Sequence, residues 1–179
     1  MKESPQFTKT IIESICESNT VKTLSKGTFL LREGDIEKHV YFVESGALRI
    51  FYLTELEEHT IRFGYKGSII NSLSSFIQGK PSEFYIEAIR KTKIRMITKE
   101  SFMNLVYQSD ESQKQYIHLL QTLITQQIER EIDLLITSPL QRLERVIQRS
   151  PDLFQHIPLK YIAFYLRMSP ETLSRIRNS

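Results

Sequence analysis

A change of hydrophobic period near Thr98 divides the chain into two parts that must fold differently. Before it, short runs of β-branched and aromatic residues alternate with turn residues rich in glycine and proline. The runs are Thr28–Leu31, Val40–Val43, Ala47–Leu53, Thr60–Phe63, Ser68–Ile70, Phe84–Ile89 and Lys93–Thr98. Many short strands at near-regular spacing are typical of an antiparallel roll or sandwich. We therefore predict an α+β chain that begins with an antiparallel, jelly-roll-like β-roll.

A short amphipathic helix is expected before the strands. Residues Gln6 to Cys16 have helical spacing, and Phe7, Ile11, Ile12 and Ile15 fall on one face. We place this helix and the β-roll in one domain, residues 1–109.

A long helix is expected after the strands. Ser101–Tyr107 fits a short helix, and Ser109 and Asp110 are suited to cap a second helix from about Glu111 to Ile136. Apolar residues recur there every three or four positions: Ile117, Leu120, Ile124, Ile128, Ile132 and Leu135. The β-roll covers one side of such a helix, and a second copy of the chain covers the other. We expect residues 110–137 to dimerise; burial against the chain's own core is the alternative.

Residues 138–179 are predicted to form a small helical domain. Ser138-Pro139 is a good helix start after a break that suits a hinge, and Leu140, Leu143, Val146 and Ile147 form the apolar face of the helix that follows. Farther on, Leu159–Leu166 has helical spacing, Arg167-Met168-Ser169 is a short connection, and a last helix begins at Pro170.

The last two helices have the pattern of a helix-turn-helix. Ala163 is small enough for a close crossing of the two axes, and Ile162, Leu166, Met168, Leu173 and Ile176 supply apolar contacts. The turn favours a left-handed backbone at Arg167, which costs a residue other than glycine about 1 kcal/mol. An ordinary helical hairpin with a polar outer face is the alternative.

The polar face of the last helix suits base and phosphate contacts. Arginine bonds guanine O6 and N7 as a pair, and glutamate accepts a bond from cytosine N4. From Ser138 to Ser179 the chain has seven basic and three acidic residues, a balance that favours a polyanion partner. The predicted DNA contacts are Ser169, Pro170, Glu171, Thr172, Ser174, Arg175, Arg177 and Lys160, with Arg167 also near phosphates.

Two motifs give the sequence a family resemblance. Leu30-Leu31-Arg32-Glu33-Gly34-Asp35 with Val40–Gly46 is similar to the first signature of cyclic-nucleotide-binding β-rolls. Tyr161–Leu166 with Ser169–Ile176 resembles the helix-turn-helix of the Crp/Fnr family of bacterial transcription regulators. The resemblance covers nearly the whole chain and implies a homodimer that binds double-stranded DNA, with RNA polymerase as a further partner.

Relatives commonly continue into a small β wing, whereas this sequence stops soon after Arg177; either its branch has a minimal DNA-binding domain or the sequence is part of a longer chain.

The region that matches the nucleotide pocket departs from the family pattern. The expected effector pocket comprises Asn71, Ser72, Leu73, Ser82 and Glu83. The resemblance places Ser72 where nucleotide-binding relatives have a ribose-binding glutamate, and Ser82 where they have a phosphate-binding arginine. Glu83 adds negative charge beside the expected phosphate, which disfavours an anion in a partly buried pocket. We therefore expect no cofactor and no binding of cyclic AMP in the usual way; the effector is left open.

Enzyme chemistry has little support in the sequence. His39, His59, His118 and His156 are far apart and do not form the cluster of a metal-dependent cupin, so no metal or catalytic residue is expected. The single cysteine, Cys16, cannot form an internal disulfide or hold an iron–sulfur cluster alone. No apolar run approaches the roughly 20 residues of a membrane span, and Met1 to Thr10 lacks a secretion signal.

The expected function is a cytoplasmic, homodimeric, sequence-specific DNA-binding regulator. The alternative is a β-roll that binds a small molecule or a protein and whose terminal helices merely pack. The two hypotheses differ in whether the helix that begins at Pro170 is exposed on one face of a two-fold dimer.

Overall fold

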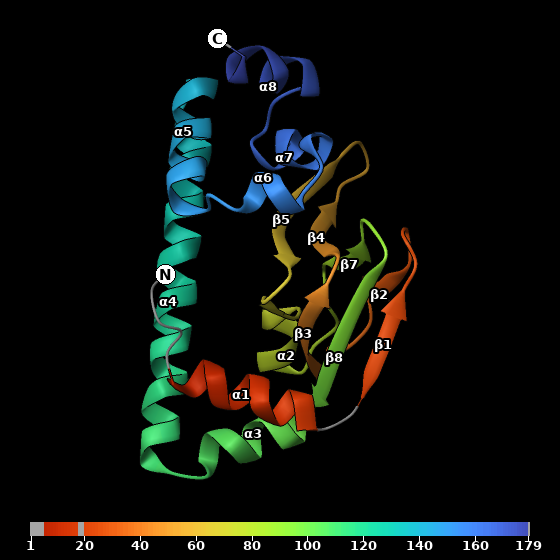
Figure 1. Ribbon diagram of the computed structural model, residues 1–179, viewed down its shortest axis with the longest axis vertical. Helices are drawn as coiled ribbons and strands as arrows, with labels where there is room; N and C mark the ends of the chain where they lie inside the picture. Colours follow the sequence, from red (N-terminus) through yellow and green to blue (C-terminus); the bar gives the residue numbers. More distant parts are fainter. Residues whose placement is uncertain (1–5, 18–19, 179) are drawn as a thin grey trace.

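The computed structural model describes residues 6–17 and 20–178. The strands are β1 Val21–Leu24, β2 Phe29–Leu31, β3 His39–Ser45, β4 Ala47–Leu53, β5 Glu58–Tyr65, β6 Ile69–Ile70, β7 Tyr85–Ala88 and β8 Thr92–Thr98. The helices are α1 Gln6–Glu17, α2 Leu73–Gln78, α3 Lys99–Tyr107, α4 Asp110–Leu135, α5 Pro139–Arg149, α6 Leu153–His156, α7 Leu159–Tyr165 and α8 Pro170–Arg177. The α+β architecture is therefore as predicted (Figure 1).

The β-roll consists of two four-stranded antiparallel sheets. Their strand orders are β1-β8-β3-β6 and β2-β7-β4-β5. Inward-facing side chains of both sheets form one buried core, which includes Val43, Leu48, Ile86 and Ile94. Strand β4 is buried over its first five residues, Ala47–Phe51, so both of its faces are covered.

The turn between β3 and β4 requires glycine. Gly46 has φ +88°, and a Cβ there would lie 2.4 Å from the backbone oxygen of Lys91. Both the left-handed backbone and the close approach of a neighbouring strand exclude a side chain. The second glycine of the predicted signature thus has a defined structural role.

Helices close one end of the roll. Ile15 of α1 and Phe102 and Val106 of α3 are buried with Val40, Phe76 and Ile97 in a second core cluster. Phe7 and Ile11, which were predicted on the inner face of α1, have side chains outside the described part of the structure.

The predicted apolar face of α5 is half right. Leu143 and Val146 are buried, but Leu140 is 45% exposed and Ile147 is 40% exposed. The reason is that α5 contacts α4 through Arg145 and Arg149, which bond Asp133, and this arrangement leaves Leu140 and Ile147 on the open side. Helices α2 and α6 were not predicted, because four to six residues are too few to show a helical period.

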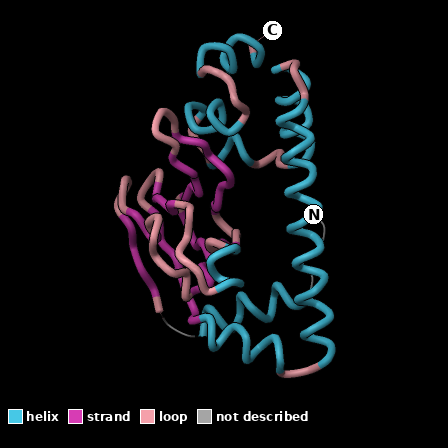
Figure 2. The backbone as a smooth tube through the Cα atoms, turned by 180° about the vertical axis from the view of Figure 1, so that it is seen from behind, coloured by secondary structure: helices cyan, strands magenta, loops and turns pink. Residues whose placement is uncertain are grey.

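The C-terminal helices share a core with the β-roll. Residues of α5 to α8 pack in one cluster with Ala47, Phe63, Tyr65 and Ile89. Figure 2 shows the strands gathered along one side of α4, with the short C-terminal helices over one end of the roll.

Candidate nucleic-acid interface and effector region

Arg167 ends α7 in the left-handed conformation that the sequence predicts. Its φ is +55°, and among the described residues it alone combines a side chain with positive φ. The Met168 N–H donates to the Ala163 oxygen at 3.0 Å, and the Arg167 N–H donates to the Phe164 oxygen at 3.1 Å. This pair of bonds satisfies carbonyls at the helix end and turns the chain sharply toward α8.

The contact between α7 and α8 is closely packed. Ile162, Ala163, Leu166 and Leu173 are fully buried. Ala163, the small residue predicted for the crossing, is buried in the same core cluster as Leu166 and Leu173. Buried Leu173 thereby fixes which face of α8 turns outward.

The start of α8 is capped by Ser169. Its Oγ accepts a hydrogen bond from the Thr172 N–H at 3.2 Å, and Pro170 occupies the first turn. Hydrogen bonds from its own backbone N–H and from Ser169 hold the pKa of Glu171 below its usual value. Glu171 is therefore ionised at neutral pH and serves as an acceptor only.

The predicted DNA contacts lie where solvent reaches them. Exposed residues are Lys160, Ser169, Glu171, Ser174, Arg175 and Arg177. Pro170 and Thr172 are half-buried. Lys160 lies on α7 with its Nζ 5.8 Å from the centre of the Phe164 ring. Arg167 is different, because its Nη1 contacts Nδ1 of His59 on β5 and so joins the turn to the β-roll.

The stripe predicted to dimerise faces away from the roll. Ile117, Ile124, Ile128, Ile132 and Leu135 are exposed; Ile124 is 60% exposed and Leu135 77%. Leu120 is half-buried. The opposite side of α4 packs against the roll through Tyr116 and Leu119.

A buried carboxylate joins α4 to α5. Asp133 is fully buried and accepts a bond from Arg145 Nε at 2.8 Å and another from Arg149 Nη2. Burial alone would raise the pKa of Asp133, but the bonds from Arg149 and Arg145 outweigh it and hold the pKa below its usual value. Sequence reasoning missed this residue, although Leu119, Leu123, Gln126, Arg130 and Asp133 recur at helical spacing on the inner face of α4.

Of the five residues predicted to form the effector pocket, the structure brings only Ser72 and Ser82 into contact. Ser72 and Ser82 are buried, and their Oγ atoms lie 2.8 Å apart. Ser82 Oγ also lies 3.0 Å from the Phe84 oxygen and accepts a bond from the Phe84 N–H at 3.0 Å, so the two serines and Phe84 form one local network. Glu83 is exposed. The prediction that Glu83 adds negative charge beside a phosphate therefore concerns an exposed side chain, whereas the two serines that replace the glutamate and arginine of nucleotide-binding relatives are buried.

The carboxylate of Glu37, in the loop between β2 and β3, is the buried acidic group bonded to this region. Glu37 is 1% exposed and accepts bonds from the backbone N–H of His39 and of Ser72 and from the Tyr41 hydroxyl. Burial raises its pKa despite these bonds. Sequence reasoning did not single out Glu37; His39 and Tyr41 are close to it in the chain, but its link to Ser72 spans 35 residues.

The remaining two pocket residues face α4. Asn71 and Leu73 line a cavity of about 210 Å³ between the roll and α4, together with apolar side chains such as Phe76, Leu119 and Leu120. The five predicted residues therefore do not surround one space.

Residues 6–17 and 20–178 contain no group of three or more histidine, cysteine, aspartate or glutamate side chains placed to hold a metal ion. None of their helices combines the length and the apolar character needed to cross a bilayer.

Comparison with known proteins extends the sequence resemblance. Residues 21–109 match the family model of the cyclic nucleotide-binding domain. No curated protein matches the chain by sequence. FixK2 from Bradyrhizobium japonicum matches in structure with a TM-score of 0.73 and 18% identity, over 89% of this chain and 82% of FixK2. The chain has the Crp/Fnr-like fold.

Two more solved structures have a similar fold. A mutant of CooA from Carboxydothermus hydrogenoformans matches with a TM-score of 0.67 and 19% identity, over 99% of this chain and 79% of CooA. The c-di-GMP responsive global regulator CLP from Xanthomonas campestris matches with a TM-score of 0.66 and 14% identity, over 95% of this chain and 90% of CLP. At these identities the likeness shows the fold alone.

Proposed function

We propose that this chain is a cytoplasmic, homodimeric transcription regulator of the Crp/Fnr type that binds specific double-stranded DNA. The observation that carries the proposal is the outer face of α8. There, Glu171, Ser174 and Arg175 are exposed while Leu173 anchors the helix in the core. Figure 1 places α8 at one end of the molecule, beyond the β-roll.

The side chains of this face match base edges. Arg175 is expected to bond guanine as a pair, and ionised Glu171 is expected to accept from cytosine. Lys160, Arg177 and the N-terminus of α8 supply phosphate contacts, which position the protein without reading sequence.

The dimer follows from α4. Its exposed stripe needs an apolar partner, and a second copy of the stripe is complementary in length and period. A two-fold axis along α4 then presents two α8 helices to successive major grooves, about 34 Å apart on a near-palindromic site. RNA polymerase is a further partner in this proposal.

The proposal excludes the usual response to cyclic AMP. Ser72 and Ser82 bond each other and leave no arginine at the position that binds the cyclic phosphate in relatives. We expect calorimetry to detect no micromolar binding of cyclic AMP; such binding would contradict this part of the proposal.

Selection from random duplex DNA tests the proposed activity. Wild-type protein is expected to enrich a two-fold-related motif, and Arg175→Ala is expected to weaken binding by about 1–3 kcal/mol and relax one base pair in each half-site. Arg32→Ala, an exposed arginine beside the Phe29 ring of the roll, is the matched control and should bind as wild type. If no motif is enriched, or if Arg175→Ala binds as wild type, the chain is better described as a small-molecule or protein-interaction module.

A further inference from the structure

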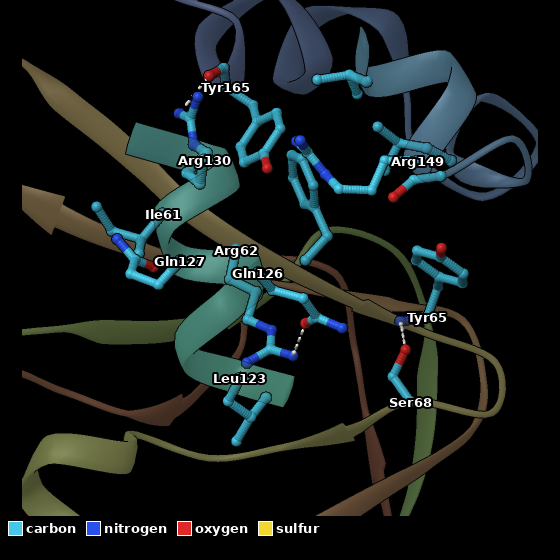
Figure 3. A pocket seen from close by; sticks show the side chains of 14 residues that line it. Ile61, Arg62, Tyr65, Ser68, Leu123, Gln126, Gln127, Arg130, Arg149 and Tyr165 are labelled. Atoms are coloured by element: carbon cyan, nitrogen blue, oxygen red, sulfur yellow. Dashed lines mark hydrogen bonds between the residues drawn. The ribbon is translucent and has the colours of Figure 1, made fainter. Parts of the chain in front are cut away.

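A second cavity lies where the β-roll, α4 and the C-terminal helices meet. Its volume is about 270 Å³. Arg62 reaches it from β5, Gln126 and Arg130 from α4, and Arg149 from α5, as Figure 3 shows. Neither Ser72 nor Ser82 lines it, but it adjoins the cavity lined by Asn71 and Leu73, with which it shares Arg62, Leu123 and Gln126.

The lining of this cavity is strongly cationic. Three of its residues are arginines, and none of the described residues that line it is acidic. Asp133 neutralises Arg149 from outside the lining. Arg62 instead donates to the neutral Oε1 of Gln126 at 3.3 Å, and no ion pair to Arg62 or Arg130 occurs among the described residues.

Arg130 is the least satisfied of the three. It is 6% exposed, and its Nε and Nη1 have no hydrogen-bond partner in the described part of the chain. Its Nη2 donates to the Tyr165 oxygen, and its guanidinium carbon lies 3.8 Å from the centre of the Tyr165 ring. A buried cation with two unused donor positions is costly unless an anion reaches it, and a guanidinium matches the paired oxygens of a phosphate or carboxylate.

We propose that this cavity binds a small organic dianion through Arg62 and Arg130. Two guanidinium groups lack a carboxylate partner, so two negative charges balance them. A volume near 270 Å³ equals that of about nine waters in the liquid, which suits a phosphomonoester or a short dicarboxylate. Gln126, Gln127 and Ser150 provide neutral polar groups around the charges.

Because the cavity lies between the β-roll and the C-terminal helices, a bound ligand affects how the two are held together. The ligand touches β5 on one side and α5 and α7 on the other, so it fixes the C-terminal helices against the roll. This consequence rests on the proposed function, whereas anion binding itself does not require DNA.

Calorimetric titration of the full chain in chloride buffer, without DNA and at constant ionic strength, tests the site. The probes are inorganic phosphate and succinate. We expect saturable binding of at least one of them, about tenfold or more weaker in Arg62→Gln and in Arg130→Gln because each loses a charge-assisted bond. The anion that binds more tightly identifies the charged group. Arg62→Gln suffices if Arg130→Gln does not fold, because Arg62 is exposed.

Two control variants separate this site from other cationic surfaces. Arg175→Gln on α8 and Arg32→Gln on the β-roll should bind the anion as wild type does. The proposal is overturned if neither probe binds saturably, if Arg62→Gln matches wild type, or if Arg175→Gln loses as much affinity as Arg62→Gln. Failure of DNA selection would leave these titrations unchanged, so the two proposals fail separately.

Discussion

At the scale of single residues, Arg167 shows how much a local signal reveals. The sequence alone indicates a left-handed residue in the turn, and Arg167 adopts φ +55° although it is not glycine. Its side chain contacts His59, which the sequence did not suggest. The backbone requirement was predictable because it depends on adjacent residues, and the contact was not because the two residues are 108 positions apart.

The backbone cost at Arg167 is measurable. Arg167→Gly and Arg167→Ala both remove the contact with His59, but alanine keeps the unfavourable φ. We expect the glycine variant to have the higher free energy of unfolding, by about 1 kcal/mol, in urea titrations. Equal stabilities would show that the turn is unstrained.

At the scale of elements, Asp133 holds α4 against α5. Asp133→Asn removes the charge that Arg145 and Arg149 share, and we expect it to lower the free energy of unfolding by about 2 kcal/mol at neutral pH. Because the pKa of Asp133 is lowered in the folded state, its contribution is present above the unfolded pKa of about 3.9 and lost as pH falls through the folded pKa.

Urea titrations of wild type and Asp133→Asn across pH 3 to 7 check this sign. The difference between them should shrink in acid. Glu131→Gln, on an exposed position of the same helix, should cost little at any pH. A difference that stays constant in acid would mean that the carboxylate charge is not what joins the helices.

The exposed stripe of α4 predicts a change of assembly. Ile124→Glu places a charge in the proposed dimer contact, and we expect sedimentation velocity to find a folded monomer, since a side chain 60% exposed is not needed by the single chain. The control is His118→Glu. Position 118 lies about 100° from Ile117 around the helix, off the apolar stripe, so this variant should remain a dimer. Monomeric wild-type protein, or a dimeric Ile124→Glu, would refute the contact.

At the scale of the whole molecule, the sequence predicts the parts better than their arrangement. Strand runs and serine caps are local, and the structure confirms Ser109, Ser138 and Ser169 as helix caps. The shared core of roll and C-terminal helices, the Ser72–Ser82 bond and the cationic cavity join distant segments, so no local pattern indicates them. The inner-face spacing of Arg130 and Asp133 on α4 was the one available signal.

The central claim is that two copies of this chain read one DNA site with α8. Light scattering coupled to size exclusion, on the complex with a duplex recovered by selection, counts the chains directly. We expect two chains on each duplex with wild-type protein and no stable complex with Ile124→Glu at the same concentration. One chain on each duplex, or a complex that Ile124→Glu forms equally well, would contradict the account.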